Sequence, residues 1–235
     1  MTSHTKYDTL DCCTVPETDA EVSSTPDATA TLAEIRDEET PADVAEIRSA
    51  GFKLLLETGR PVTVEDLIFA TDVPAERVAE IFDSVRARGR VELNDEGHLI
   101  GLAGLTLTPG RHELTIDGST RYTWCALDAV GILGALQATG TVRSTDPQTG
   151  DAIEIAFVEG KPDTDVHLFI LGGFTEGNVR EDWCPRVNFF TSRRAAEEWV
   201  TDNTLDGNIV AVADIAEDAA AMWQPVVKAD APQVR

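Results

Sequence analysis

The chain has 235 residues, 42% of them hydrophobic, enough apolar material for one large domain or two small ones. No stretch approaches the roughly 18 apolar residues of a membrane span, and residues 1–11 lack the features of a signal peptide, so a cytoplasmic protein is expected. The net charge is −23, from 42 acidic and 19 basic residues. Nucleic acids and anionic membranes attract clustered positive charge, so neither is expected as a partner. Such acidity is typical of halophilic proteins, whose self-repulsion is screened by salt.

Residues 1–40 are predicted to form a disordered acidic tail. The segment 14–31 is rich in Pro, Ser, Thr and acidic residues and offers almost nothing to bury.

Residues 41–103 are predicted to form a winged-helix-like domain of three helices and a hairpin. Apolar residues at helical spacing end at Gly59, and two further helices follow over residues 64–69 and from residue 75. Residues 91–93 and 99–102 flank a turn and predict the hairpin. Between residues 60 and 100 the acidic residues outnumber the basic ones by nine to five. This charge favours a packing role for the domain over DNA binding.

Residues 104–235 are predicted to form an α+β domain with a mostly antiparallel sheet and flanking helices. Strand patterns and helix patterns do not alternate regularly in this half, which argues against a parallel sheet. The expected strands cover residues 105–108, 113–116, 121–124, 141–144, 152–158, 166–171, 186–190 and 209–212. The expected helices cover residues 126–137, 193–200 (capped by Ser192) and 215–223.

Cys125 and Asp128 lie where a predicted strand meets a predicted helix. A helix N-terminus lowers the pKa of a thiol, and Asp128 falls on the same face three residues later. The rest of the helix is apolar nearly all round and is therefore expected to be buried, which raises the pKa of a carboxyl and allows it to carry a proton. A purely structural role is the alternative, because cysteine is often buried and Asp favours a first helical turn.

Cys184 stands at the entrance of a later predicted strand and could equally be a buried cysteine. Two cysteines and an aspartate could form a site for a soft, thiophilic metal. A structural zinc site is not expected, because the chain has no CxxC and its histidines are not at zinc-ligand spacing.

Several segments together resemble the organomercurial (alkylmercury) lyases. The resemblance is strongest at residues 121–128, RYTWCALD, and further blocks occur in the same order over residues 59–62, 73–79, 100–107 and 183–190. The sequence is similar to that family over about residues 41–223, as an acidic, haloarchaeal-like member. The resemblance implies a winged-helix-like domain followed by an α+β catalytic domain, in agreement with the elements above.

By this resemblance Cys125 and Cys184 are the catalytic thiols that hold mercury, and Asp128 is the proton carrier and a weak third ligand. The implied reaction is protonolysis of a carbon–mercury bond, which gives a hydrocarbon and Hg(II) in mercury detoxification. No organic cofactor is implied; a cytosolic thiol is the co-substrate, and mercuric reductase is an implied partner. The alternative is a mercury-binding or metal-binding sensor of the same fold, which needs the sulfur ligands but no proton donor.

The chain departs from the family pattern at two places. A turn at Asp146 replaces a third, structural cysteine of the family, and Pro185 replaces a second cysteine beside Cys184. Outside the resemblance, Cys12 and Cys13 are either idle or a mobile thiol pair that exchanges mercury with the site. Tyr122 and Trp124 either wall the site or belong to the core.

Overall fold

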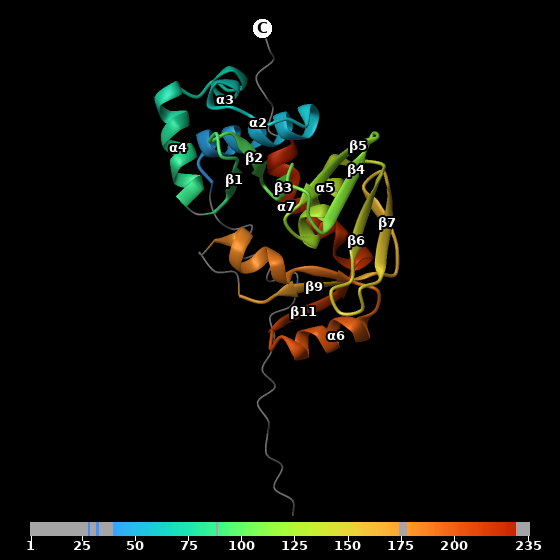
Figure 1. Cartoon of the computed structure of the whole chain (residues 1–235). Helices are drawn as coiled ribbons and strands as arrows, with labels where there is room; N and C mark the ends of the chain where they lie inside the picture. Colours follow the sequence, from blue (N-terminus) through green and yellow to red (C-terminus); the bar gives the residue numbers. More distant parts are fainter. Residues whose placement is uncertain (1–27, 29–31, 33–39, 88, 174–177, 229–235) are drawn as a thin grey trace, which may run out of the picture.

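The computed structural model describes residues 28, 32, 40–87, 89–173 and 178–228 (Figure 1). Most of the predicted tail, Cys12 and Cys13 lie outside these residues. Ala28 and Leu32, within the segment expected to be disordered, are helical and buried in the main core. The chain therefore packs against the fold at these two positions.

Three helices and a hairpin follow residue 40, as predicted. The helices are α2 (Ala42–Thr58), α3 (Val64–Ala70) and α4 (Ala75–Ala87), and the hairpin strands are β1 (Val91–Leu93) and β2 (Leu99–Leu102). Gly59 ends α2 in the left-handed conformation, which glycine adopts without strain. Thr63 and Asp66 form a capping box that begins α3.

An eight-stranded sheet runs through both halves of the chain, in the order β1-β2-β3-β5-β4-β6-β7-β8, with antiparallel neighbours throughout. Its later strands are β3 (Leu105–Thr106), β4 (His112–Ile116), β5 (Ser119–Thr123), β6 (Gly140–Thr145), β7 (Ala152–Val158) and β8 (Lys161–Asp163). Strand β7 alternates strictly between exposed and buried residues, so one face of the sheet is covered. The predicted α+β fold with an antiparallel sheet is confirmed.

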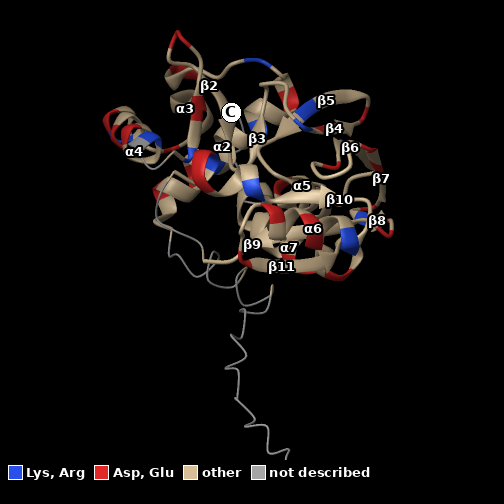
Figure 2. Ribbon diagram, turned by 60° about the horizontal axis from the view of Figure 1, so that its bottom comes forward, with Lys and Arg blue, Asp and Glu red and all other residues tan. Residues whose placement is uncertain are grey.

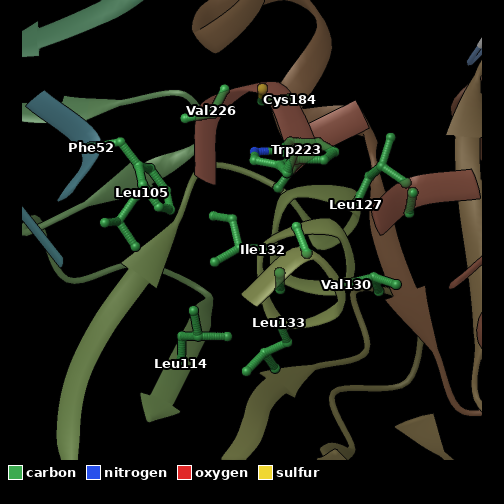
Figure 3. Close-up of a cluster of buried hydrophobic side chains, with 14 of the residues drawn as sticks. Phe52, Leu105, Leu114, Leu127, Val130, Ile132, Leu133, Cys184, Trp223 and Val226 are labelled. Carbon is green, nitrogen blue, oxygen red and sulfur yellow. The ribbon is translucent and has the colours of Figure 1, made fainter. Parts of the chain in front are cut away.

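A buried helix pair covers this sheet. Helix α5 (Ala126–Leu136) packs against α7 (Val212–Lys228), and Figure 3 shows Trp223 of α7 among Leu127, Ile132 and Val226. Two glycines of α5 permit the close approach. A Cβ at Gly131 would overlap the Trp223 ring, and one at Gly134 would lie 2.8 Å from the Ala220 Cβ.

A smaller three-stranded sheet lies on the other side of α5, where Figure 1 shows it in orange below the large sheet. Its strands are β9 (His167–Leu171), β10 (Asn188–Phe190) and β11 (Gly207–Ala211), in the order β10-β9-β11. Helix α6 (Arg193–Asp202) covers this sheet through Phe169, Phe190 and Trp199, and Ser192 caps it as predicted.

Local differences from the sequence-based expectations are confined to short segments. Strand β10 begins at Asn188 rather than at residue 186, because Cys184–Arg186 forms a 3-10 turn after a π-helical turn, Val179–Trp183. Strand β8 has only three residues, one of them proline, and was not predicted.

The proposed domain boundary at residue 103 stays a prediction. Strands β2 and β3 pair across it, and residues from both sides share one hydrophobic core. Within the described residues no helix is long and apolar enough to cross a membrane. Figure 2 shows that acidic residues are spread over helices and loops and outnumber the basic ones.

Candidate active site

Cys125 is the residue that caps helix α5, at the junction with β5. Its preceding strand ends at Thr123, whose hydroxyl donates to the Cys125 carbonyl over 2.9 Å. The first helical N–H, of Ala126, donates to the carbonyl of Val187 over 3.1 Å. This bond joins the start of α5 to the segment that carries Cys184, which follows Cys125 by 59 residues along the chain but is adjacent to it in space.

Asp128 lies in the first turn of α5 and points back toward Cys125. Its Oδ2 accepts the Cys125 backbone N–H at 2.8 Å, in a capping-box arrangement. Cysteine is not a common residue at this position, where Ser, Thr, Asp and Asn prevail. The arrangement therefore places a thiol where a hydroxyl would ordinarily satisfy the helix.

Cys184 enters the site from the turn between the π-helical segment and β10. Pro185 follows it, and the Val187 N–H returns to the Cys184 carbonyl over 3.1 Å, which closes the turn. Cys184 is 2% exposed and belongs to the main core cluster. Figure 3 shows it at the top edge of the drawn side chains.

The structure brings all three predicted site residues together. One ligand atom each from Cys125, Asp128 and Cys184 lies within 4.8 Å of the other two, and all three residues are buried. Among the described residues this is the group of Cys, His, Asp and Glu side chains that is arranged to hold a metal ion. Two sulfurs and a carboxylate form a soft donor set, which suits a thiophilic metal.

Burial governs the protonation of this cluster. It raises the pKa of Asp128 to about 6, although hydrogen bonds from Cys125 act in the opposite direction. It also raises the pKa of Cys125 well above its ordinary value, with further contributions from Cys184 and the Asp128 charge. The sequence predicted a lowered pKa for Cys125 at the helix N-terminus; that expectation was wrong, because complete burial removes the thiolate from water.

The pKa of Cys184 has opposing influences. The hydrogen bond with Cys125 lowers it, but burial and the charge of Asp128 together raise it, and Arg180 lowers it again, so that the net shift is upward. Both cysteines are therefore thiols near neutral pH, and Asp128 is the group that changes its protonation there.

Gly104 is a site residue that the sequence analysis missed. Ala103 and Gly104 both have positive φ and form the tight turn between β2 and β3. A Cβ at Gly104 would overlap the Asp128 carboxyl, so only glycine leaves room for it. The pair of turn residues between two short apolar strands was the available sequence signal.

Trp223 supports this turn from α7. Its indole N–H donates to the Ala103 carbonyl over 2.8 Å, and the ring lies against Gly131 of α5. The backbone N–H of Trp124 donates to the Gly104 carbonyl over 2.9 Å. The turn that confines Asp128 is thus fixed from both sides.

A cavity of about 320 Å³ opens beside Cys184 and is lined by Trp124 but not by Cys125, Asp128 or Tyr122. Trp124 therefore lines the cavity beside Cys184 and also packs against the main core, so both sequence alternatives apply to it in part. Glu92 of β1 also lines the cavity, although its side chain is only 11% exposed. It accepts hydrogen bonds from Thr106, Thr108 and the Trp124 indole at 2.7–3.1 Å.

Asp146 occupies a structural position in the turn where the family's third cysteine was expected. It is fully buried, and its Oδ2 accepts the N–H and the hydroxyl of Thr191, both over 2.8 Å. Its Oδ1 accepts the N–H groups of Gln148 and Thr149. The carboxylate thus ties the β6–β7 turn to the start of α6 without a thiol.

Comparison with known proteins places the chain in a family. Residues 105–224, which include all three cluster residues, match the family described as MerB: Alkylmercury lyase. An alkylmercury lyase of Bacillus cereus is 33% identical over 168 residues, or 69% of this chain and 74% of that protein. One of Streptomyces lividans is 30% identical over 183 residues, or 76% of this chain and 82% of that protein.

A solved structure, the mercury-bound form of MerB2, has the same fold. It superposes with a TM-score of 0.74 at 20% identity, over 85% of this chain and 98% of that one. With the family match, the sequence identities and the fold in agreement, this chain belongs to the alkylmercury lyase family.

Proposed function

We propose that this chain cleaves the carbon–mercury bond of organomercurials by protonolysis, with Cys125, Cys184 and Asp128 as the reacting groups. The observation that carries the proposal is the buried cluster in which two sulfurs and a carboxylate oxygen lie within 4.8 Å of one another. A binding protein or sensor would need the two sulfurs, but it would have no use for a buried carboxyl whose pKa is raised to about 6.

The first step is a thiol exchange. The organomercurial arrives as R–Hg–SR′, where R′SH is a small thiol. Cys184 lines the cavity and is therefore the thiol that the mercury meets first. A bond forms between its sulfur and mercury, the Hg–SR′ bond breaks, and the Cys184 proton leaves with R′S⁻ as R′SH.

The second step transfers a proton within the cluster. Cys125 bonds to mercury as its proton passes to the Asp128 carboxylate, which is hydrogen-bonded to the same residue. The pKa near 6 leaves Asp128 ionised at neutral pH yet basic enough to accept this proton. The two thiolates then donate charge to mercury and weaken its bond to carbon.

The last step releases the hydrocarbon. Asp128 delivers its proton to the departing carbon as the carbon–mercury bond breaks, which gives R–H and Hg(II) held by both sulfurs. Two external thiols displace Hg(II) and restore the cysteine protons. These reaction steps use no organic cofactor, and cytosolic thiols serve as co-substrate. We propose a cytoplasmic setting, with mercuric reductase as the enzyme that consumes the product.

The test is to incubate the protein with phenylmercury and excess thiol in high salt and to measure benzene. Cys125→Ser and Cys184→Ser should each abolish benzene formation, because a hydroxyl does not replace a thiolate on soft mercury. A Ser119→Ala variant, altered at an exposed position at the start of β5, serves as a mutational control. Benzene formation at the parental rate by either cysteine variant would overturn the assignment.

A further inference from the structure

The cavity beside Cys184 carries positive charge in a chain that is strongly negative. Three charged side chains line it, Glu92, Arg111 and Arg180, and His112 adds none because burial lowers its pKa to about 3. The lining therefore carries one net positive charge, whereas the chain as a whole carries −23. An anionic group is the ligand that such a cavity favours.

Glu92 is not available to a ligand. Its two oxygens already accept from two threonine hydroxyls and the Trp124 indole, and Arg180 lies 3.5 Å from Oε1. A carboxylate with three short hydrogen bonds and a guanidinium charge beside it attracts an ammonium group less strongly than a free carboxylate does. The cavity is therefore not suited to cationic ligands.

The two arginines, in contrast, retain donors. Arg180 contacts Glu92 and Glu181 at 3.5 and 3.7 Å, longer than good hydrogen bonds, and its buried Nε has no hydrogen-bond partner among the described residues. Arg111 is exposed, and its Nη1 donates a hydrogen bond to the side-chain carbonyl of Asn188. A guanidinium offers five N–H donors, so each side chain has others left for a carboxylate.

The reaction decides which part of the substrate occupies this cavity, and this step rests on the function proposed above. The carbon bound to mercury has to reach Asp128, which does not line the cavity. The sulfur carrier R′S is the other ligand of a two-coordinate mercury and remains on the cavity side, where Cys184 displaces it.

We propose that the cavity receives the thiol carrier of the organomercurial and that Arg111 and Arg180 select carriers that bear a carboxylate. The arginines are specificity-determining residues: they bind the carrier and take no part in breaking the carbon–mercury bond. A small mercapto acid fits the chemistry, since its carboxylate pairs with the arginines while its sulfur holds mercury against Cys184.

The test uses phenylmercury adducts of three thiols of similar size, each assayed in an excess of the same thiol at one ionic strength. The thiols are 3-mercaptopropionate, 2-mercaptoethanol and cysteamine, which are anionic, neutral and cationic. Benzene release should show a KM roughly tenfold lower for the anionic adduct than for the neutral one, as expected for charge-assisted hydrogen bonds, and a higher KM for the cationic adduct. Equal KM values for the three adducts would overturn the proposal.

Substitutions then connect the preference to the arginines. The preference is the KM of the neutral adduct divided by that of the anionic adduct. It should fall toward unity in Arg111→Gln and in the double variant Arg111→Gln/Arg180→Gln, whereas Arg111→Lys should keep part of it. Arg143→Gln, which removes an exposed arginine outside the cavity, should leave it unchanged. Because Arg111 is exposed, its single variant tests the proposal even if the double variant fails to fold; a preference that survives in Arg111→Gln contradicts the role of this residue.

A further arm separates the carrier from the organic group. With 2-mercaptoethanol as the thiol, 4-carboxyphenylmercury and phenylmercury should have similar KM values, because the organic group faces Asp128. A tenfold advantage for the carboxylated aryl group would show that the arginines bind R rather than the carrier. Failure of all adducts to release hydrocarbon would instead refute the proposed function itself.

Discussion

Two buried aspartates, Asp128 at the start of α5 and Asp146 in the β6–β7 turn, differ in what surrounds them. Asp128 is 6% exposed and Asp146 is fully buried. Asp146 accepts four hydrogen bonds, from Gln148, Thr149 and twice from Thr191. Asp128 accepts the backbone N–H of Cys125, and its other side faces Gly104 and two thiols.

The protonation of the two residues differs accordingly. Burial acts to raise the pKa of Asp146, but its hydrogen bonds together outweigh burial and the pKa is lowered. Burial dominates at Asp128 and raises the pKa to about 6. The balance between desolvation and hydrogen-bond donors thus decides whether a buried carboxyl is a permanent anion that holds the fold or a group able to carry a proton.

The largest effect is expected from Asp128→Asn. The amide cannot accept the Cys125 proton or deliver one to carbon, so benzene release from phenylmercury should fall by roughly 10²–10⁴-fold. Mercury should still bind, since both sulfurs remain, and can be followed by the ultraviolet absorbance of mercury–thiolate bonds. Parental turnover by this variant would remove Asp128 as the proton carrier.

The two carboxyls should also give opposite pH dependences of stability. The folded state binds a proton at Asp128 more tightly than the unfolded chain does, so this group lowers stability as pH rises from about 3.8 to about 6, by at most roughly 3 kcal/mol. The pKa of Asp146 is lowered from its ordinary value of 3.8. This group therefore stabilises the fold at pH values above 3.8, and the stabilisation is lost as the pH falls below that value.

This contrast is measurable by urea unfolding at several pH values in constant salt. The free energy of unfolding of Asp128→Asn minus that of the parent should be larger at pH 7 than at pH 4. The reason is that at pH 7 the parent carries a charge that burial disfavours, whereas the variant does not. The same difference at both pH values would contradict the raised pKa.

A smaller effect, confined to stability, is expected from Asp146→Asn. The amide nitrogen would face N–H and O–H donors, so unfolding should become easier by about 1–3 kcal/mol. Benzene release per folded molecule should not change, because Asp146 does not contact the thiols. Urea midpoints and single-temperature activity separate the two effects; lost activity with full stability would place Asp146 in the chemistry.

The smallest effect per residue is expected from the exposed acidic residues, whose mutual repulsion is screened by salt. We expect the melting temperature to rise by a few degrees between 0.1 and 1 M KCl, as the Debye length falls from about 10 to 3 Å. Calorimetry in KCl is the measurement. A melting temperature that does not respond to salt would argue against the halophilic interpretation.

Residues close in sequence were the predictable part of this protein. The helix that ends at Gly59, the cap at Ser192 and the pairing of Cys125 with Asp128 follow from local spacing. Contacts across long separations left no periodic signal, and so Gly104 beside Asp128 and Glu92 beside Trp124 were missed. Residue chemistry alone left Cys184 open as either a metal ligand or a buried cysteine, and the resemblance to a family assigned it to the site, since no local pattern relates it to Cys125.

The complete burial of the Cys125 thiol was the second feature that spacing could not predict. The position of Cys125 at a helix N-terminus was predicted and is confirmed, yet the direction of its pKa shift was not. That direction depends on the core that closes around α5, to which α7 and the small sheet contribute from far along the chain.

The pairing of β2 with β3 joins the described residues 40–102 to the rest of the large sheet. A proteolytic cut or truncation at residue 103 would strip two strands from the sheet and leave the backbone of β3 as an unpaired edge. It would also cut the turn at Ala103 and Gly104 that confines Asp128. The fragment 104–235 should therefore aggregate rather than survive as a smaller enzyme, and amide hydrogen exchange should report β2 and β5 opening together.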